Sequence, residues 1–344
     1  DDVESRGLGD VYKRQEKYMS YIPKYKLNNK MVSLVADISR IIGSVSALSN
    51  FDKNPKLRRV NRIRTIHDSL AIEQNTLTLE QVTSVLNGKM VIAPPKDIQE
   101  VKNAYEIYEL LDTLDPYSVD DLLKAHGVMT RGLVEESGAF RTKPVGVVDS
   151  KSGEVIHVGT LPAYVPQAVE DLLQWLKSDD TNDIIKSCIF HFEFESIHPF
   201  LDGNGRTGRL WQTLILSKVD PIFAYLPIES MIYKKQDEYY QAINDSDYAG
   251  ESTEFIIFML ETIKDALVEA TTQSDIQSDK ANVTLEEQKI IDLIIDNPNI
   301  TQNELAKALN VTERTIKRRM KTMQDKDLIK RENGKRNGRW IVNE

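Results

Sequence analysis

The chain has 344 residues, of which 40% are apolar and 28% charged, as in a globular protein long enough for two or three domains. No apolar run approaches the ~20 residues that span a bilayer, and residues 1–15 lack the apolar segment of a signal peptide. The single cysteine, Cys188, excludes an intrachain disulfide and a cysteine-rich zinc site. We therefore expect a cytoplasmic protein with no membrane partner.

The net charge of −9 is unevenly distributed. Residues 281–344 contain 13 Lys/Arg and 10 Asp/Glu, so they carry +3 and the preceding 280 residues carry −12. An acidic body with a basic C-terminal part suggests that the two parts have different partners. Residues 1–15 have no clear periodicity and include RGLGDVYKRQ, a string that resembles translated adapter read-through, so we exclude them from the fold prediction.

Apolar residues recur with helical spacing over most of the chain. Helices are predicted at residues 27–48, 56–72, 79–86, 98–114, 119–131, 165–177, 181–197, 205–218, 234–244 and 252–270. Residues 140–161 are the exception, because two β-rich runs there flank a glycine-bearing turn at 149–153 and predict a hairpin. The predicted fold class is mainly α with one projecting β-hairpin.

The polar stretch 271–282 predicts a linker. Beyond it, helices are predicted at 285–297, 302–309 and 313–326, and short strands at 328–330 and 340–342 flank the loop 334–338. This order is typical of a small winged helix-turn-helix domain. Its third helix is rich in Lys and Arg, so DNA is the candidate partner and a protein-contact surface is the alternative.

One segment combines the residue types that hold a polyphosphate beside a proton acceptor. It is the central loop, residues 197–209, which lies between two predicted helices. Gly203 and Gly205 permit positive φ and close approach of a ligand, and the helix that begins near Gly205 offers its N-terminus to an anion. Arg206 and Arg209 are three apart, hence on one face, and can bind phosphate oxygens bidentately.

Two further side chains of the central loop supply chemistry. Asp202 is a hard oxygen ligand suited to magnesium that bridges phosphates. His198 has an ordinary pKa near ~6.5, so it accepts a proton at neutral pH. A His-Pro pair or a glycine-rich turn alone is more often structural, but all these features within one short segment favour function.

The string HPFLDGNGRTGR at 198–209 resembles, without a mismatch, the signature HPFx[DE]GNGRxxR of Fic-domain proteins, whose best-known activity is AMPylation. SGAFR at 137–141 and the following hairpin resemble the segment leading into the family's target-docking flap. SLAIE at 69–73 resembles the inhibitory motif [ST]xxxE[GN], with Gln74 where glycine or asparagine is usual. Its wider setting is similar to the endoplasmic-reticulum Fic enzyme that modifies and demodifies a chaperone. The resemblance covers residues 27–270.

The resemblance implies a protein adenylyltransferase that transfers AMP from ATP, with Mg²⁺, to a Ser, Thr or Tyr hydroxyl of a target protein. It places an N-terminal helical region with the inhibitory motif at 16–115 and a Fic catalytic core at 116–270, and the linker (271–282) and the winged helix (283–344) described above follow them. His198 would be the general base, Asp202 would hold magnesium and Arg209 would reach the γ-phosphate.

The resemblance also implies residues for the remaining parts of the site. The phosphate cradle would comprise Gly203, Asn204, Gly205 and Arg206, and the adenine would lie near Tyr239 and Tyr240, for which core packing is the alternative. The flap strand Val155, Ile156, His157 and Val158 would pair with an extended target segment by β-augmentation. Glu73, in a motif that begins at Ser69, would restrain the enzyme because its carboxylate competes with the γ-phosphate for Arg209.

Other functions stay open at this stage. Glu73 could position a water for removal of AMP, or it could be an ordinary charge on a surface helix. The chain could instead be a nucleotide-sensing, DNA-binding transcription regulator, although the intact His198 and Asp202 argue against this. It could also use another donor, such as UMP or phosphocholine, or perform a phosphotransfer. The target protein and the oligomeric state stay open, and a homodimer is a candidate.

Overall fold

The structure is a computed structural model that describes residues 21–48, 55–148, 155–280, 285–309, 311–325, 328–332 and 339–342. The chain divides into two compact units, Asp1–Val268 and Glu269–Glu344. Residues 1–15, which we excluded from the fold prediction, lie outside the described residues. The turn of the predicted flap and the loop of the predicted wing also lie outside them.

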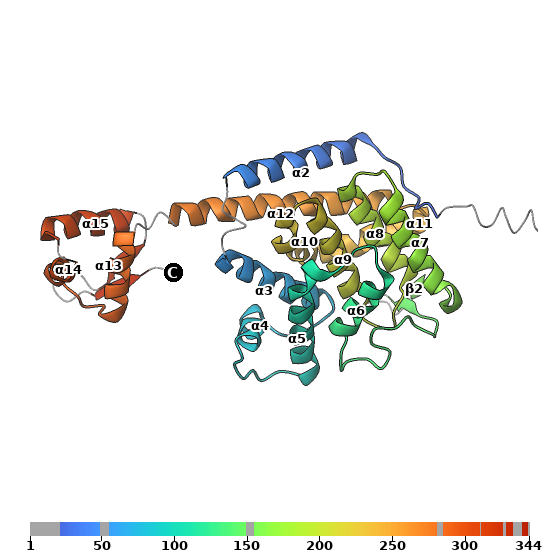
Figure 1. Cartoon of the computed structure of the whole chain (residues 1–344), viewed down its shortest axis with the longest axis horizontal. Helices are drawn as coiled ribbons and strands as arrows, with labels where there is room; N and C mark the ends of the chain where they lie inside the picture. The colour runs from blue at the N-terminus through green and yellow to red at the C-terminus, as the bar shows by residue number, and fades with distance from the viewer. Residues whose placement is uncertain are drawn as a thin grey trace, which may run out of the picture. The chain divides into compact units, whose positions relative to one another are not determined.

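The first unit is mainly helical (Figure 1). Its helices are α2 (Asn29–Leu48), α3 (Pro55–Ile72), α4 (Leu79–Leu86), α5 (Pro95–Glu109), α6 (Val119–Met129), α7 (Val165–Ser178), α8 (Asp183–Ile197), α9 (Asn204–Val219), α10 (Ile228–Lys234), α11 (Gln236–Ala249) and the first part of α12 (Thr253–Lys280), which continues past the end of the unit at Val268. Short 3₁₀ helices are η2 (Leu111–Thr113), η3 (Pro162–Tyr164) and η4 (Pro221–Tyr225). Strands β1 (Gly146–Val148) and β2 (Val155–Val158) form an antiparallel hairpin. The predicted fold class is confirmed.

Helices α8 and α9 form the centre of this unit and are joined by the central loop. α8 is buried on nearly all sides, and Ile189, Phe190 and Phe194 are fully buried, as expected for a helix that is apolar all round. Trp211 of α9 is also fully buried, and its Nε1 donates to the carbonyl of Pro116 at 3.0 Å. The central loop is therefore held at both ends by core helices.

Helix α12 differs from its predicted extent. It lies beside α2 in Figure 1, with Lys264 Nζ 2.6 Å from Asp37 Oδ2. It continues to Lys280, so most of the stretch predicted as a linker is helical. Polarity suggested a linker, but residues 271–280 contain neither glycine nor proline, and nothing in their sequence ends a helix. Among the described residues, no helix has the length and hydropathy of a bilayer span.

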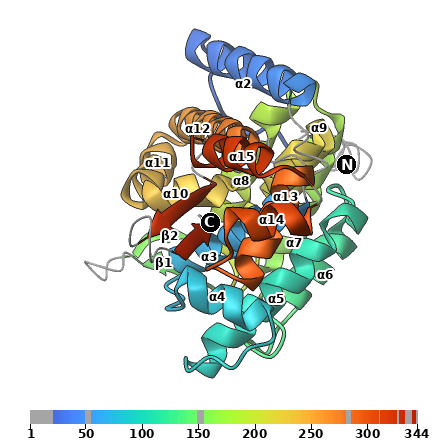
Figure 2. The same cartoon turned by 90° about the vertical axis from the view of Figure 1, so that its left-hand side faces the viewer.

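The second unit has the predicted winged-helix order. It comprises α13 (Leu285–Asp296), α14 (Gln302–Ala308), α15 (Glu313–Asp325) and the antiparallel strands β3 (Ile329–Glu332) and β4 (Arg339–Val342), drawn in red in Figure 2. Ile290, Leu305, Ile316, Met320 and Trp340 form its buried core. Thr301 caps α14 in a reciprocal capping box with Glu304. This part of the prediction is confirmed.

Candidate functional site

The backbone of the central loop is held in a defined turn. α8 ends at Ile197, and His198 adopts a left-handed conformation with φ 51° and ψ 62°. The Asn204 amide binds the backbone of Phe200 in both directions, because Oδ1 accepts from its N–H and Nδ2 donates to its carbonyl, each at 2.8 Å. Asn204 was predicted to line the cradle, and its buried side chain shapes the loop from within.

The two predicted glycines of the loop serve different needs. Gly203 has φ +84°, as expected, but Gly205 lies in the first turn of α9 and its φ is not positive, so that prediction is wrong. Gly205 is needed for space, because a Cβ there would lie 2.3 Å from Glu73 Oε1 and 3.0 Å from Arg209 Nη1. The Glu73 carboxylate therefore lies against the N-terminus of α9, the place where an anion binds a helix.

Arg209 is bound by the end of α3. Its Nε donates to Ser69 Oγ at 3.1 Å, and its Nη2 donates to the Ser69 carbonyl at 2.9 Å and to Glu73 Oε1 at 2.8 Å. Arg209 is 2% exposed, whereas the Glu73 side chain is 35% exposed. Burial acts to lower the pKa of Arg209, but nearby negative charge, first that of Glu73, outweighs burial and raises it. The guanidinium is a buried cation neutralised by one carboxylate near the surface.

The turn that carries Glu73 contains an unusual residue. Gln74 has φ +66°, and the N–H groups of Gln74 and Asn75 donate to the carbonyls of Ala71 and Leu70 at 3.0 and 3.1 Å. These two bonds form a Schellman cap, whose left-handed position glycine normally occupies. A glutamine there costs about 1 kcal/mol or more. Gln74, the residue that departs from the inhibitory motif, therefore has a strained backbone conformation, but the turn still forms.

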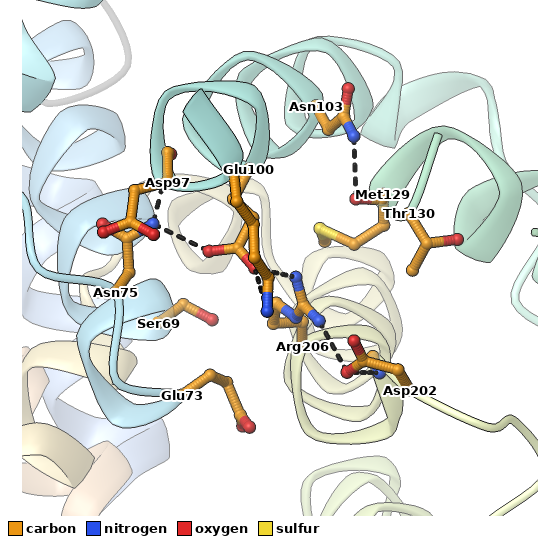
Figure 3. Close-up of polar contacts among 12 residues, drawn as sticks. Ser69, Glu73, Asn75, Asp97, Glu100, Asn103, Met129, Thr130, Asp202 and Arg206 are labelled. Atoms are coloured by element: carbon orange, nitrogen blue, oxygen red, sulfur yellow. Dashed lines mark hydrogen bonds and ion pairs between the residues drawn. The ribbon is translucent and has the colours of Figure 1, made fainter. Parts of the chain in front are cut away.

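Arg206 is bound by two carboxylates, as Figure 3 shows. Its Nη1 lies 3.2 Å from Glu100 Oε1 and its Nη2 lies 2.9 Å from Asp202 Oδ1. The Nε of Arg206 is buried without a hydrogen-bond partner among the described residues. A buried donor of this kind suits the oxygen of a ligand, since leaving it unmet is unfavourable.

Glu100 also connects Arg206 to the turn after Glu73 (Figure 3). Asn75 Nδ2 donates to Glu100 Oε2 at 2.8 Å, and the N–H of Thr76 donates to Asp97 Oδ2 at 3.0 Å. The first turns of α5 thus hold both the turn of Glu73 and the arginine of the predicted cradle. Glu100 was not predicted, because a carboxylate in an amphipathic helix gives no sequence sign that it is buried.

The carboxylate of Asp202 is accessible at the start of α9 and is a hard oxygen ligand of the kind that magnesium takes. Its side chain is 44% exposed, and Oδ1 accepts from the N–H of Gly203 at 2.6 Å. Among the described residues there is no group of three His, Cys, Asp or Glu side chains that could hold a metal ion. Magnesium commonly takes one or two carboxylates and completes its shell with phosphate oxygens and water.

The imidazole of His198 is partly exposed and oriented by its own helix. Its Nδ1 lies 3.3 Å from the Glu195 carbonyl and 3.9 Å from Glu195 Oε2, and 21% of the side chain is exposed. A hydrogen on Nδ1 that faces the carbonyl leaves the lone pair on Nε2. His198 can therefore accept a proton at Nε2.

His126, on α6, supports the loop and was missed by sequence reasoning. Its ring stacks on Phe200 with centroids 3.6 Å apart. Its Nδ1 accepts from the N–H of Gly138 at 3.0 Å, so Nε2 carries the hydrogen and donates to the Asp202 carbonyl at 2.9 Å. Burial lowers the pKa of His126 to about 4. The neutral ring is part of the structure that holds Asp202.

The two predicted adenine residues have different environments. Tyr239 is 2% exposed, and its hydroxyl lies 3.0 Å from His191 Nε2, so it is a core residue. Burial lowers the pKa of His191 to about 3. Tyr240 is 41% exposed, and burial, followed by the charge of Glu73, raises its pKa. Tyr240 lies near Glu73 and remains available to a ligand.

The flap consists of β1 and β2, with Gly146 opposite Val158 and Val147 opposite His157. The sheet has two strands among the described residues, so the outer edge of β2 has no partner strand there. The side chains of Val155, Ile156, His157 and Val158 lie outside the described residues. Their backbone offers the edge that strand addition requires.

Known protein families match both units. Residues 116–216 match the Fic/DOC family, and residues 287–330 match the winged helix-turn-helix DNA-binding family. The crystal structure of a Fic family protein from Desulfovibrio desulfuricans G20 is 40% identical, with a TM-score of 0.78, and covers 94% of this chain and 98% of that chain. The structure of Fic-1 (residues 134–508) from Caenorhabditis elegans shares the fold at 22% identity and a TM-score of 0.54, over 71% of this chain and 72% of that chain.

Two curated relatives are named as enzymes. Protein adenylyltransferase fic-1 of Caenorhabditis briggsae is 27% identical over 290 residues, which are 78% of this chain and 53% of that protein. Protein adenylyltransferase Fic of Nematostella vectensis is 29% identical over 222 residues, 60% of this chain and 49% of that protein. The chain spans about half the length of the curated relatives it matches.

Proposed function

This chain belongs to the Fic family, and from that premise we propose that it is a protein adenylyltransferase that transfers AMP from ATP to a hydroxyl group of a target protein. The observation that carries the proposal is the central loop. It combines a partly exposed imidazole, a helix N-terminus against which a carboxylate already lies, and two buried arginines. A helix N-terminus and arginines bind the phosphates of a triphosphate, and an imidazole accepts a proton.

In the proposed reaction the oxygen of a Ser, Thr or Tyr hydroxyl bonds to the α-phosphorus of ATP. The bond from the α-phosphorus to the oxygen that bridges to the β-phosphate breaks, and pyrophosphate leaves with that oxygen. Nε2 of His198 takes the hydroxyl proton. Asp202 would hold Mg²⁺, which neutralises phosphate charge when bound, and the Nε of Arg206, which has no hydrogen-bond partner among the described residues, would bind a phosphate oxygen. Tyr240 would lie by the adenine, and the edge of β2 would pair with the target.

Glu73 is the proposed restraint on this reaction. The ion pair between Glu73 and Arg209, at 2.8 Å, supports the idea, because a γ-phosphate on Arg209 would have to displace that carboxylate. The space against Gly205 supports it too, since Glu73 Oε1 lies where a phosphate oxygen would approach the helix. The same carboxylate could direct a water at a bound AMP ester. Loss of label from pre-labelled protein, on addition of wild type but not of Glu73→Gly, would test that second activity.

The decisive experiment compares ATP labelled at the α- or the γ-phosphate. Purified wild type, Glu73→Gly and Glu73→Gly/His198→Ala are incubated with labelled ATP and Mg²⁺, with and without cell lysate. We expect Glu73→Gly to incorporate α-label at least about tenfold faster than wild type, a difference of ~1.4 kcal/mol in barrier. The His198→Ala double variant should incorporate none.

The controls separate the parts of the proposal. Glu80→Gly removes another exposed glutamate from the same region and should leave incorporation at the wild-type rate. Equal labelling of wild type and Glu73→Gly would end the inhibition proposal and leave transfer standing. Transfer of γ-label would replace adenylylation by phosphotransfer, and no label at all would favour a nucleotide sensor.

We also propose that the second unit binds DNA. Besides the family match over residues 287–330, the support is a set of exposed cations on α15: Arg314, Lys317, Arg318 and Lys321. The third helix of a winged helix-turn-helix commonly enters the major groove. Electrophoretic mobility shift with random duplex DNA tests the proposal, and absence of binding even at low salt would leave a protein-contact role.

A further inference from the structure

A buried arginine outside the predicted site holds the backbone of the central loop. Arg141 is 2% exposed, and among the described residues its guanidinium donates only to backbone carbonyls. Nε donates to His198 at 2.6 Å, Nη1 to Lys143 at 3.0 Å, and Nη2 to Ile197 at 3.3 Å and also to Thr160. Burial lowers the pKa of Arg141, and four carbonyl dipoles offset the desolvation of the cation.

Two of these carbonyls are the last of α8 and its cap. The final carbonyls of a helix lack partners within the helix and carry partial negative charge, so Arg141 caps α8 with a cation. His198 adopts the left-handed conformation, which costs a non-glycine residue about 1–2 kcal/mol. Both of its backbone groups are bound: the N–H donates to Phe194 at 2.9 Å, and the carbonyl accepts from Arg141. These bonds hold the strained turn in place.

The same arginine connects that turn to the base of the flap. The N–H of Arg141 donates to the Pro199 carbonyl at 3.0 Å, and the N–H of Thr160 donates to the Ile197 carbonyl at 3.3 Å. Residues 197–199 therefore lie between the chain that leads into β1 and the chain that leaves β2. Packing is close, because a Cβ on Gly159 would lie 2.9 Å from Arg141 Nη2 and 3.2 Å from His198 Cβ.

We propose that Arg141 is the positioning residue for His198: it holds the left-handed turn from which the imidazole projects and fixes that turn relative to the flap. The inference rests on the proposed transfer reaction, because it concerns the base of that reaction. Arg206 and Arg209, the cations of the proposed cradle, lie on α9 and bind none of the partners of Arg141. Loss of Arg141 should therefore misplace the base and leave ATP binding intact.

The test uses the unrestrained Glu73→Gly protein and adds Arg141→Gln or Arg141→Lys. We expect Arg141→Gln to lower kcat for transfer about 100-fold, the cost of a misplaced catalytic group, while KM for ATP changes less than about twofold. Arg141→Lys keeps the charge but cannot reach four carbonyls at once, so its kcat should lie between that of the Glu73→Gly protein and that of Arg141→Gln. Arg131→Gln is the matched control, because that guanidinium is 56% exposed and binds Glu106; both parameters should stay unchanged.

Several outcomes would overturn the inference. An unchanged kcat in folded Arg141→Gln would do so, and so would parallel loss of ATP binding and transfer, which would indicate a general structural role. If Arg141→Gln does not fold, Arg141→Lys and Gly159→Ala carry the test. The added methyl of Gly159→Ala presses on the guanidinium and on His198, and should lower kcat with little change in KM.

Failure of the proposed function would look different, since Glu73→Gly itself would then transfer no label. A measurement that needs no enzyme activity distinguishes failure of the inference about Arg141 from failure of the proposed function. The chain has five histidines, and the imidazole NMR signal of His198 can be assigned with His198→Gln. In Arg141→Gln this signal should shift more than those of His126 and His191. A His198 signal that does not move would overturn the inference even in an inactive protein.

Discussion

The cations of the central loop and those of α15 are placed in opposite environments. Arg206 and Arg209 are 3% and 2% exposed, and protein carboxylates bind both, those of Glu100, Asp202 and Glu73. The basic residues of α15 named above are exposed. One region holds its positive charge inside the protein, and the other presents it to solvent.

Because of this difference, ligand binding should respond to different factors in the two regions. A ligand of Arg209 must take the place of a protein carboxylate, so binding there depends on a competition inside the molecule and is only weakly screened by salt. A polyanion on α15 displaces counterions instead, so its affinity depends steeply on ionic strength.

The largest effect should come from Arg209. In the Glu73→Gly protein, Arg209→Gln should weaken ATP binding about 100-fold, because it removes a buried charged donor, and should leave AMP binding nearly unchanged. Isothermal titration calorimetry with both nucleotides measures this. An equal loss for ATP and AMP would contradict a γ-phosphate role, and a steep salt dependence of the remaining affinity would break the contrast with α15.

The second effect concerns pH and should be confined to the first unit, since residues 269–344 contain no histidine. The folded pKa of His126, about 4, is below its ordinary 6.5, so the unfolded chain binds the proton more readily. The stability that this group contributes is present above pH 6.5 and is lost as pH falls toward 4, by about 1.4 kcal/mol at pH 5.5. Urea unfolding at pH 7.5 and 5.5 measures it. The difference in stability between wild type and His126→Asn should shrink accordingly.

The third effect tests the exposed cations. Arg318→Gln and Lys321→Gln should each weaken DNA binding by about tenfold or less and lower the slope of log affinity against log salt by about one. Fluorescence anisotropy across a salt series gives both quantities. Arg319→Gln is the comparison, because that side chain is 21% exposed and pairs with Glu286. A larger effect of Arg319 than of Arg318 would mean that a different face binds.

The smallest effect should come from Gln74. Gln74→Gly should stabilise the first unit by about 1 kcal/mol or less, because glycine adopts positive φ without strain but loses more backbone entropy on folding than glutamine does. It should also lower the residual transfer of wild type, since the turn of Glu73 is firmer. Gln74→Ala keeps the strained conformation and should give neither gain. Thermal unfolding and α-label incorporation report the two results separately.

Sequence reasoning recovered those features whose signal is local. The helical periods and the glycine with positive φ at Gly203 both depend on residues a few positions apart. The extent of α12 was mispredicted, because polarity alone resembles a linker when no helix-ending residue is present. The difference in burial between Tyr239 and Tyr240 could not be predicted, because it depends on which other elements pack against each side of the helix.

Residue types and their spacing were enough to predict a mainly helical protein with a loop that contains a histidine, an aspartate and two arginines, followed by a basic winged helix. These properties follow from residue type and spacing. Three contacts are seen only in the folded protein: the ion pair of Glu73 with Arg209, the ion pair of Glu100 with Arg206, and the hydrogen bond from Arg141 to the His198 carbonyl. Those partners come from elements more than 50 residues apart along the chain, and a buried polar side chain carries no local sign of the group that satisfies it.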